Sequence, residues 1–328
     1  MGVTDPASTL ASALAAGTVV LDGGLATELE RAGHDVSTDL WSARVLRDDP
    51  EAVLAAHLAF FAAGAQVATT ASYQASYEGF AAEGLSRSEA AGLLRRSVEL
   101  GRAAQRAHAD AGPAGQARPP TWVAASIGPY GAMLAGGQEY TGEYAAADRG
   151  GGMDVTALAR FHRPRLEVLA EAGPDVLALE TIPCLAEAEA LLGEVERLGV
   201  PAWLSLTTVT GPGDLLRTRR GEPAEQAFAM ARDVDAVVAV GVNCTDPAGV
   251  AGAARLAAAA GGKPVVVYPN SGETWDGPGR IWRGDGRFDV AEVSGWAAAG
   301  ARLIGGCCRV GPNEIAAIAA ILRDAPAA

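Results

Sequence analysis

The sequence is poor in cysteine, in lysine and in positive charge. Four cysteines in 328 residues are too few for a secreted disulfide scaffold. Acidic residues outnumber basic ones by 39 to 26, which gives a formal net charge of −13. Nucleic acid and anionic membranes would be repelled, so neither is expected as a partner. Lys263 is the only lysine, which leaves a single candidate for Schiff-base chemistry.

Targeting and membrane-spanning segments are also missing. The first residues have no basic region followed by a compact apolar core, so no signal peptide is expected. The longest apolar stretch, residues 52–71, is interrupted by His57, Gly64 and Gln66. It predicts a packed helix followed by a strand rather than a membrane span. We therefore expect a cytoplasmic protein with reduced thiols, and an oligomer is compatible with the sequence.

Short apolar runs of the β type alternate with longer stretches of helical spacing along nearly the whole chain. The runs are almost continuously apolar, as strands buried on both faces should be. One helical stretch, residues 86–111, opens with the capping-box pattern of Ser86 and Glu89. Eight apolar runs are present, at residues 18–22, 66–70, 121–126, 175–181, 201–207, 236–243, 264–268 and 302–306.

This alternation predicts an α/β fold, a (β/α)8 TIM barrel. No linker is visible, so we expect a single domain over residues 1–328, with a core at about 18–323 and enlarged loops at 128–153 and 271–286. A doubly wound open sheet is the rival fold, but it needs a Gly-x-Gly-x-x-Gly turn after the first strand. From Asp22 the chain reads DGGLAT, which lacks that turn, and no P-loop is present.

Reactive or polar side chains stand where the predicted strands end. In a barrel of this kind the active site lies at the carboxyl ends of the strands, so these side chains should meet in one mouth. Seven of the eight runs end in such residues, among them Asp22, Thr69, Ser126, Glu180, Asn243, Cys244, Tyr268, Cys307 and Cys308.

Three of the four cysteines, Cys244 among them, belong to this set. One free cysteine is commonly a small buried hydrophobe, but three at strand ends on one barrel face are less easily explained that way. Cys307 and Cys308 are adjacent, and both can face one site only if the backbone turns, which Gly305 and Gly306 permit. Three converging thiolates indicate a tetrahedral Zn²⁺ site with one open position.

A zinc ion held by three thiolates is a weak Lewis acid and is poorly suited to activating water. It suits a substrate thiol, which loses its proton on the metal and stays nucleophilic. The residues therefore favour thiol activation for alkyl transfer. Asp22 and Glu180 form either a general acid/base pair or a clamp for a substrate ammonium. The clamp is better motivated, because an amino acid with a side-chain thiol carries both a thiol for the zinc and an ammonium for the carboxylates. The alternative for Asp22 is a simple turn residue.

Seven segments, in order along the chain, resemble motifs of the homocysteine S-methyltransferases. They span about residues 19–322, and the two cysteine motifs together are highly specific. The segments are residues 21–29 (LDGGLATEL), 70–74 (TASYQ), 126–131 (SIGPYG), 180–183 (ETIP), 241–244 (GVNC), 268–273 (YPNSGE) and 305–308 (GGCC).

The resemblance implies a (β/α)8 barrel, a Zn²⁺ cofactor and methyl transfer to homocysteine that forms methionine. In this resemblance Cys244, Cys307 and Cys308 match the metal ligands and make up the catalytic centre. Asp22 and Glu180 match the acids near the homocysteine amino group. The other residues implied in substrate binding are Gly23, Thr69, Tyr73, Ser126 and Asn243.

The ETIP and YPNSGE forms look more like the branch of the family that uses S-methylmethionine than the branch that uses betaine. The implied reaction is an in-line methyl transfer from a sulfonium donor, with S-methylmethionine first and S-adenosylmethionine second. Sulfonium cations prefer aromatic faces and carboxylates. Aromatic candidates in the enlarged loops are Tyr130, Tyr140, Trp275 and Trp282, with simple loop packing as the alternative.

The sequence is also compatible with two alternative functions. The same barrel can serve betaine, another methyl donor or another thiol acceptor. A non-catalytic zinc or redox sensor with vicinal thiols also explains the cysteines, although it does not explain Asp22 and Glu180 at strand ends.

Overall fold

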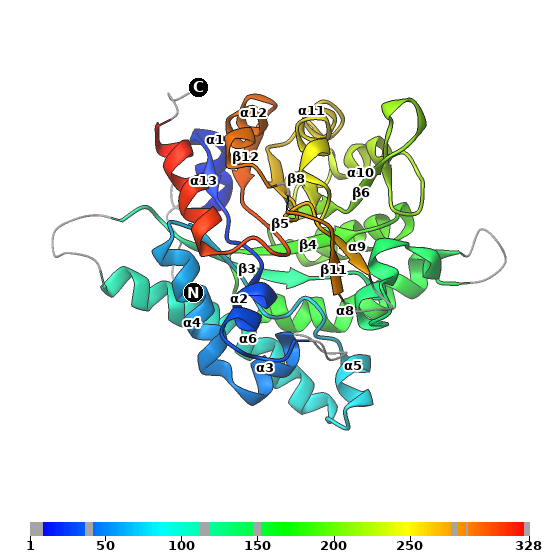
Figure 1. The fold of residues 1–328 in the computed structure, drawn as a ribbon. Coiled ribbons are helices and arrows are strands. Elements are labelled where there is room, and N and C mark those ends of the chain that lie inside the picture. The colour runs from blue at the N-terminus through cyan, green and yellow to red at the C-terminus, as the bar shows by residue number, and fades with distance from the viewer. Residues whose placement is uncertain are drawn as a thin grey trace.

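The centre of the molecule is a parallel sheet of eight strands surrounded by helices (Figure 1). The computed structural model describes residues 9–36, 42–111, 118–146, 152–276, 281–286 and 288–324. The strand order is β1-β12-β9-β8-β5-β4-β3-β2, and a parallel bridge between Leu21 and Val67 brings the two end strands together. The predicted TIM-like barrel is therefore confirmed. Its strands are β1 (Val19–Val20), β2 (Val67–Thr69), β3 (Trp122–Ile127), β4 (Val176–Ile182), β5 (Ala202–Leu206), β8 (Val237–Asn243), β9 (Val265–Tyr268) and β12 (Ala301–Ile304).

Helices fill the connections between strands. The predicted capping box begins α6, because the Ser86 and Glu89 side chains each accept a hydrogen bond from the other residue's backbone N–H. Within the described residues, no helix has the length and apolar character needed to cross a membrane. The α-helices are α1 (Leu10–Ala16), α2 (Leu25–Arg31), α3 (Ser42–Asp48), α4 (Pro50–Ala62), α5 (Tyr77–Ala82), α6 (Arg87–Asp110), α7 (Tyr130–Met133), α8 (Val155–Glu171), α9 (Leu185–Leu198), α10 (Ala224–Ala231), α11 (Val250–Gly261), α12 (Val293–Ala298) and α13 (Pro312–Asp324).

The strands are apolar throughout because they are buried on both faces. In β4, Leu177 and Leu179 belong to the large cluster between sheet and helices, whereas Val176 and Ala178 belong to a separate cluster inside the barrel. Successive side chains of a strand point to opposite faces, which gives this division. The interior cluster includes the fully buried Trp203, so the barrel is packed and the site must lie at its mouth.

Both predicted enlarged loops follow carboxyl ends of strands. The loop after β3 contains α7 and two short 3₁₀ helices, η2 (Gln138–Tyr140) and η3 (Glu143–Ala145). The loop after β9 contains an antiparallel hairpin of β10 (Thr274–Asp276) and β11 (Ile281–Arg283). A second hairpin, which was not predicted, follows β5 and consists of β6 (Thr208–Thr210) and β7 (Leu216–Thr218).

A glycine inside β8 is fixed by the neighbouring strand. A Cβ atom on Gly241 would lie 1.8 Å from the carbonyl oxygen of Val266 in β9. We expect Gly241→Ala to lower the free energy of unfolding by about 3 kcal/mol, or to prevent folding, since a packed barrel cannot move one strand aside.

The matched control is Gly252→Ala on the exposed face of α11, where nothing lies within 4 Å of the new methyl group. It should stabilise the protein by about 0.5–1 kcal/mol, because alanine is the better helix former. Urea unfolding of both variants checks the pair, and equal effects would contradict this account of the strand contact.

Candidate active site

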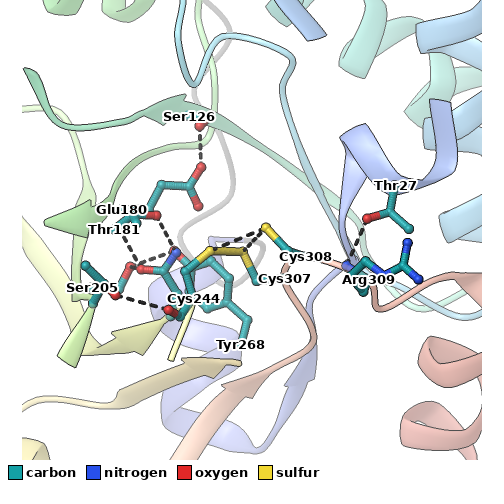
Figure 2. The surroundings of a disulfide bond; sticks show 12 residues. Thr27, Ser126, Glu180, Thr181, Ser205, Cys244, Tyr268, Cys307, Cys308 and Arg309 are labelled. Atoms are coloured by element: carbon teal, nitrogen blue, oxygen red, sulfur yellow. Dashed lines mark hydrogen bonds between the residues drawn. A yellow bond between two sulfur atoms is a disulfide. The ribbon is translucent and has the colours of Figure 1, made fainter. Parts of the chain in front are cut away.

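Three cysteine sulfurs meet at the carboxyl ends of β8 and β12. Cys244 directly follows β8, and Cys307 and Cys308 follow β12. The Sγ atom of Cys308 lies 3.8 Å from that of Cys244 and 3.9 Å from that of Cys307, and Cys244 and Cys307 are joined as a disulfide (Figure 2). All three Sγ atoms lie within 4.8 Å of one another. The structure thus brings together the sulfurs that the sequence singled out, as a metal site requires.

The turn that presents the vicinal cysteines differs from our expectation. We attributed it to the conformational freedom of Gly305 and Gly306, but the residue with a left-handed backbone is Arg309, with φ of 68°. The glycines are needed for close packing instead. A Cβ on Gly305 would lie 2.6 Å from the carbonyl oxygen of Asp22, and one on Gly306 would lie 2.1 Å from the Val310 side chain.

Arg309 is held in this unusual conformation from two sides. Its backbone N–H donates to the Thr27 hydroxyl at 2.9 Å (Figure 2), and its guanidinium donates to Glu273 at 2.9 Å. A left-handed conformation of a residue other than glycine costs on the order of 1–3 kcal/mol and persists only where the surroundings impose it. The connections after β1 and β9 therefore hold the turn after β12, which presents the two sulfurs.

A second strained region lies beneath Cys244. Cys244 and Thr181 have positive φ values of 45° and 61°. The Asn243 amide holds Thr181 in place: its oxygen accepts from the Thr181 N–H at 2.7 Å, and its nitrogen donates to the Thr181 hydroxyl at 2.8 Å. Asn243, which the sequence predicts among the substrate-binding residues, is fully buried in the structure and is not part of the wall of the cavity described below. Its role in substrate binding stays a prediction.

Two buried carboxylates face the sulfurs. A cavity of about 110 Å³, called here the site cavity, is lined by Asp22, Glu180 and the three cysteines. Both Asp22 oxygens accept hydrogen bonds from Thr69, one from its N–H at 2.6 Å and one from its hydroxyl at 2.7 Å. Glu180 accepts a short hydrogen bond from the Ser126 hydroxyl (Figure 2).

Burial dominates the electrostatics of these acids. Loss of hydration raises the pKa of Asp22 to about 7, although the Thr69 hydrogen bonds act against the shift. It also raises the pKa of Glu180 to about 7. In the same way burial raises the pKa of the Cys308 thiol to about 12. The site cavity therefore holds groups whose charged forms need a cation beside them.

Four more of the residues predicted to bind substrate line the site cavity. Gly23, Thr69, Tyr73 and Ser126 are all part of its wall. Gly23 is irreplaceable there, because a Cβ on it would lie 2.4 Å from the carbonyl oxygen of Val310.

Tyr268 and Glu139 also line the site cavity. Tyr268 was expected at the mouth but was given no role, whereas Glu139 was not predicted at all. The Tyr268 hydroxyl accepts from the Trp203 indole N–H at 2.9 Å and lies 2.7 Å from the Ser205 hydroxyl. Glu139 is buried, and its Oε2 atom has no hydrogen-bond partner among the described residues. The end of β9 signalled Tyr268, but nothing near Glu139 distinguishes it from an ordinary loop glutamate.

The loop aromatics divide between the mouth and the core. Tyr140 lines the site cavity, and Trp275 and Trp282 line a neighbouring cavity of about 390 Å³ that also reaches Cys308. Tyr130 instead packs against Phe161, with ring centroids 4.9 Å apart, which is the loop packing that we weighed as the alternative.

The raised pKa of Glu180 has a consequence for stability. The folded-state pKa of about 7 lies above the usual value of a glutamate. The fold therefore gains stability from protonated Glu180; this contribution is fully present below pH ~4 and is lost as pH rises through ~7. In metal-free protein, Glu180→Gln should match the wild type near pH 4 and exceed its unfolding free energy by on the order of 2 kcal/mol at pH 8.

Urea unfolding at the two pH values tests this, with the exposed Glu196→Gln on α9 as the matched control that should show no pH-dependent difference. Equal stabilities of Glu180→Gln and wild type at pH 8 would contradict the pKa of this carboxyl.

Comparisons with known proteins agree with this geometry. Residues 19–322 match the homocysteine S-methyltransferase family. Homocysteine S-methyltransferase 4 of Zea mays is 44% identical over 95% of this chain and 91% of its own. Homocysteine S-methyltransferase YbgG of Bacillus subtilis is 42% identical over 93% of this chain and 95% of its own.

A solved structure shows the same likeness. The homocysteine methyltransferase MmuM from Escherichia coli, in its metallated form, is 39% identical, with a TM-score of 0.80 over 93% of this chain and 96% of that one. Its oxidized form matches with a TM-score of 0.79. Sequence, fold and site together show that the chain belongs to the homocysteine S-methyltransferase family.

Proposed function

We propose that this protein is a zinc-dependent enzyme that transfers a methyl group from a sulfonium donor, S-methylmethionine before S-adenosylmethionine, to the thiol of homocysteine to form methionine. The observation that carries the proposal is the convergence of three cysteine sulfurs and two buried carboxylates on one small cavity. A thiol amino acid is the ligand that needs both sets of groups.

The donor set fits zinc. Three thiolate sulfurs that lie within 4.8 Å of one another supply three corners of a tetrahedron and leave the fourth for a ligand, and their softness favours zinc over magnesium or calcium. Because the thiolate is the ligand form, Cys244 and Cys307 hold a metal only when their disulfide is reduced. When bound, the metal lowers the pKa of a substrate thiol so that the thiol reacts as its thiolate.

The carboxylates fit the other end of homocysteine. Asp22 and Glu180 are both buried, and each keeps its orientation through a hydrogen bond to a strand residue, Thr69 or Ser126. An ammonium group placed between them restores the charge compensation that burial removed. Their role is then to orient the amino acid so that its sulfur reaches the cysteines, and no proton transfer by either acid is required.

The transfer itself needs little acid or base. The thiol proton leaves before transfer, and a sulfur lone pair of homocysteine forms the new bond to the methyl carbon. The electron pair of the broken bond stays on the donor sulfur, which departs as a neutral thioether. Because no charge develops on the leaving group, alignment of the two sulfurs and the methyl carbon is the main contribution of the chain.

The cysteines should decide the metal content. We expect reduced wild-type protein to bind close to one zinc per chain, and Cys244→Ser and Cys308→Ser to lose most of it. Cys184→Ala is the matched control, because Cys184 is buried in an apolar cluster at the start of α9, and it should retain full metal content. Elemental analysis after dialysis measures this, and full zinc in both site variants would refute the ligand assignment.

Product formation tests the reaction. With S-methylmethionine, S-adenosylmethionine and betaine offered separately, methionine should form fastest from S-methylmethionine, as measured by mass spectrometry. Glu180→Gln should raise the KM for homocysteine at least about tenfold, since it removes a charge-assisted hydrogen bond. It should leave the KM for the donor unchanged.

The matched acceptor is 4-mercaptobutanoate, which is homocysteine without its amino group. Its slower methylation should be the same in wild type and Glu180→Gln. If Glu180→Gln slowed the methylation of both acceptors by the same factor, Glu180 would not bind the ammonium group. If betaine were the best donor, the sulfonium assignment would be refuted.

A further inference from the structure

A second cavity adjoins the cysteine cluster and is not used by homocysteine in the account above. It has a volume of about 530 Å³ and lies between the β6–β7 hairpin, the turn after β8 and the loop after β9. We call it the outer cavity. Tyr140 lines both it and the site cavity, so the two cavities meet at this ring.

The outer cavity wall contains one cationic side chain, Arg219, and two carboxylates, Asp246 and Glu273. Glu273 is paired with Arg309, and Asp246 interacts with Arg219 electrostatically without forming an ion pair with it. Arg219 follows β7 and is half-buried in the cavity wall. Its guanidinium donates to the Thr207 hydroxyl at 3.0 Å and the Cys244 carbonyl at 3.4 Å, and its Cζ atom lies 5.2 Å from the centre of the Tyr140 ring.

We propose that Arg219 binds the carboxylate of the methyl donor, so that the outer cavity selects sulfonium amino acids over sulfonium ions without a carboxylate. This inference rests on the proposed function and adds the chemical class and orientation of the donor. A planar guanidinium suits a carboxylate because it can donate two parallel hydrogen bonds.

The length of such a donor would bring its sulfonium group toward the site cavity when its carboxylate is bound at Arg219. In S-methylmethionine two methylenes and the α-carbon separate the carboxylate from the sulfonium, about 5 Å when extended, given carbon–carbon bonds of about 1.5 Å. A donor held by Arg219 therefore brings its sulfonium to the Tyr140 ring, at the seam of the two cavities. An aromatic face stabilises a cation, and the unpartnered Glu139 oxygen lies on the neighbouring residue of the same 3₁₀ helix.

The neighbouring cavity that contains Trp275 and Trp282 is the rival site. It also contains an arginine, Arg309, but the Arg309 guanidinium is already paired with Glu273 at 2.9 Å. A donor carboxylate bound there would have to displace that ion pair. Arg219 requires no such exchange, because it makes no ion pair with the described residues.

The test compares two sulfonium ligands that differ only in the carboxylate: S-methylmethionine and its decarboxylated analogue, (3-aminopropyl)dimethylsulfonium. Titration calorimetry without homocysteine measures binding of each to the zinc-loaded protein, since no methyl acceptor is present. The wild type should bind S-methylmethionine at least about tenfold more tightly than the analogue, and Arg219→Gln should abolish that preference. Arg219→Lys should retain part of it, because the charge remains but the paired donors do not.

Arg217→Gln is the matched control. It removes the same charge from the same hairpin, but its guanidinium donates to the Gly221 carbonyl and it is not part of the outer cavity wall, so the preference should stay. Equal binding of the two ligands by the wild type, or a preference that survives Arg219→Gln, would overturn the inference. A rise in the KM for homocysteine in Arg219→Gln, with donor binding unchanged, would overturn it too.

The activity of the wild type separates this inference from the proposed function. If the wild type forms methionine from S-methylmethionine but its binding preference does not depend on Arg219, the proposed function stands and only the role of Arg219 is removed. A wild type that neither binds S-methylmethionine nor uses it refutes the donor assignment, and the inference with it.

Discussion

The convergence of three sulfur atoms on one point is the constraint on which the rest of this site depends. Cys244 and the pair after β12 come from different strands, and their sulfurs lie within 4.8 Å of one another. The chain accepts unfavourable backbone conformations at Cys244 and Arg309 to achieve this, and such strain persists only where the surroundings impose it. A closed barrel supplies those surroundings, because it fixes the ends of neighbouring strands relative to one another.

The same barrel mouth keeps carboxylates away from water without giving them a permanent cation. Asp22 and Glu180 are hydrogen-bonded but not ion-paired within the described residues, and burial raises the pKa of each to about 7. A buried charge of this kind costs stability in the free protein. The cost is consistent with a site shaped for a ligand that brings its own positive charge, as the ammonium of an amino acid does.

The alternation of apolar runs and helical stretches made the barrel predictable. The features that were not predicted depend on tertiary contacts, which leave no pattern in the sequence. Eight apolar runs located every barrel strand, and their ends located the cysteines, Asp22 and Glu180. The β6–β7 hairpin was not predicted because the last two residues of β6 are exposed, so the strand shows no apolar run in the sequence. The sequence places Asn243 at a strand end but does not say which way its amide points, so its hydrogen bonds to Thr181 could not be predicted. Glu139 is buried by tertiary packing alone.

A methyl transfer between two sulfurs requires that both substrates be held at once and face each other across the methyl carbon. Two cavities that share the Tyr140 ring satisfy that requirement in a way that one larger cavity would not, because each substrate is fixed from its own side. The site cavity has the carboxylates Asp22 and Glu180, which suit an ammonium, and no arginine or lysine among the described residues of its wall. The outer cavity has Arg219, beside Asp246 and Glu273, and Arg219 is the group that we propose for a carboxylate. If the donor is S-methylmethionine, as proposed, it shares its carbon chain with homocysteine and differs in two S-methyl groups and a positive charge, so walls of different chemistry are what would hold the two in opposite orientations.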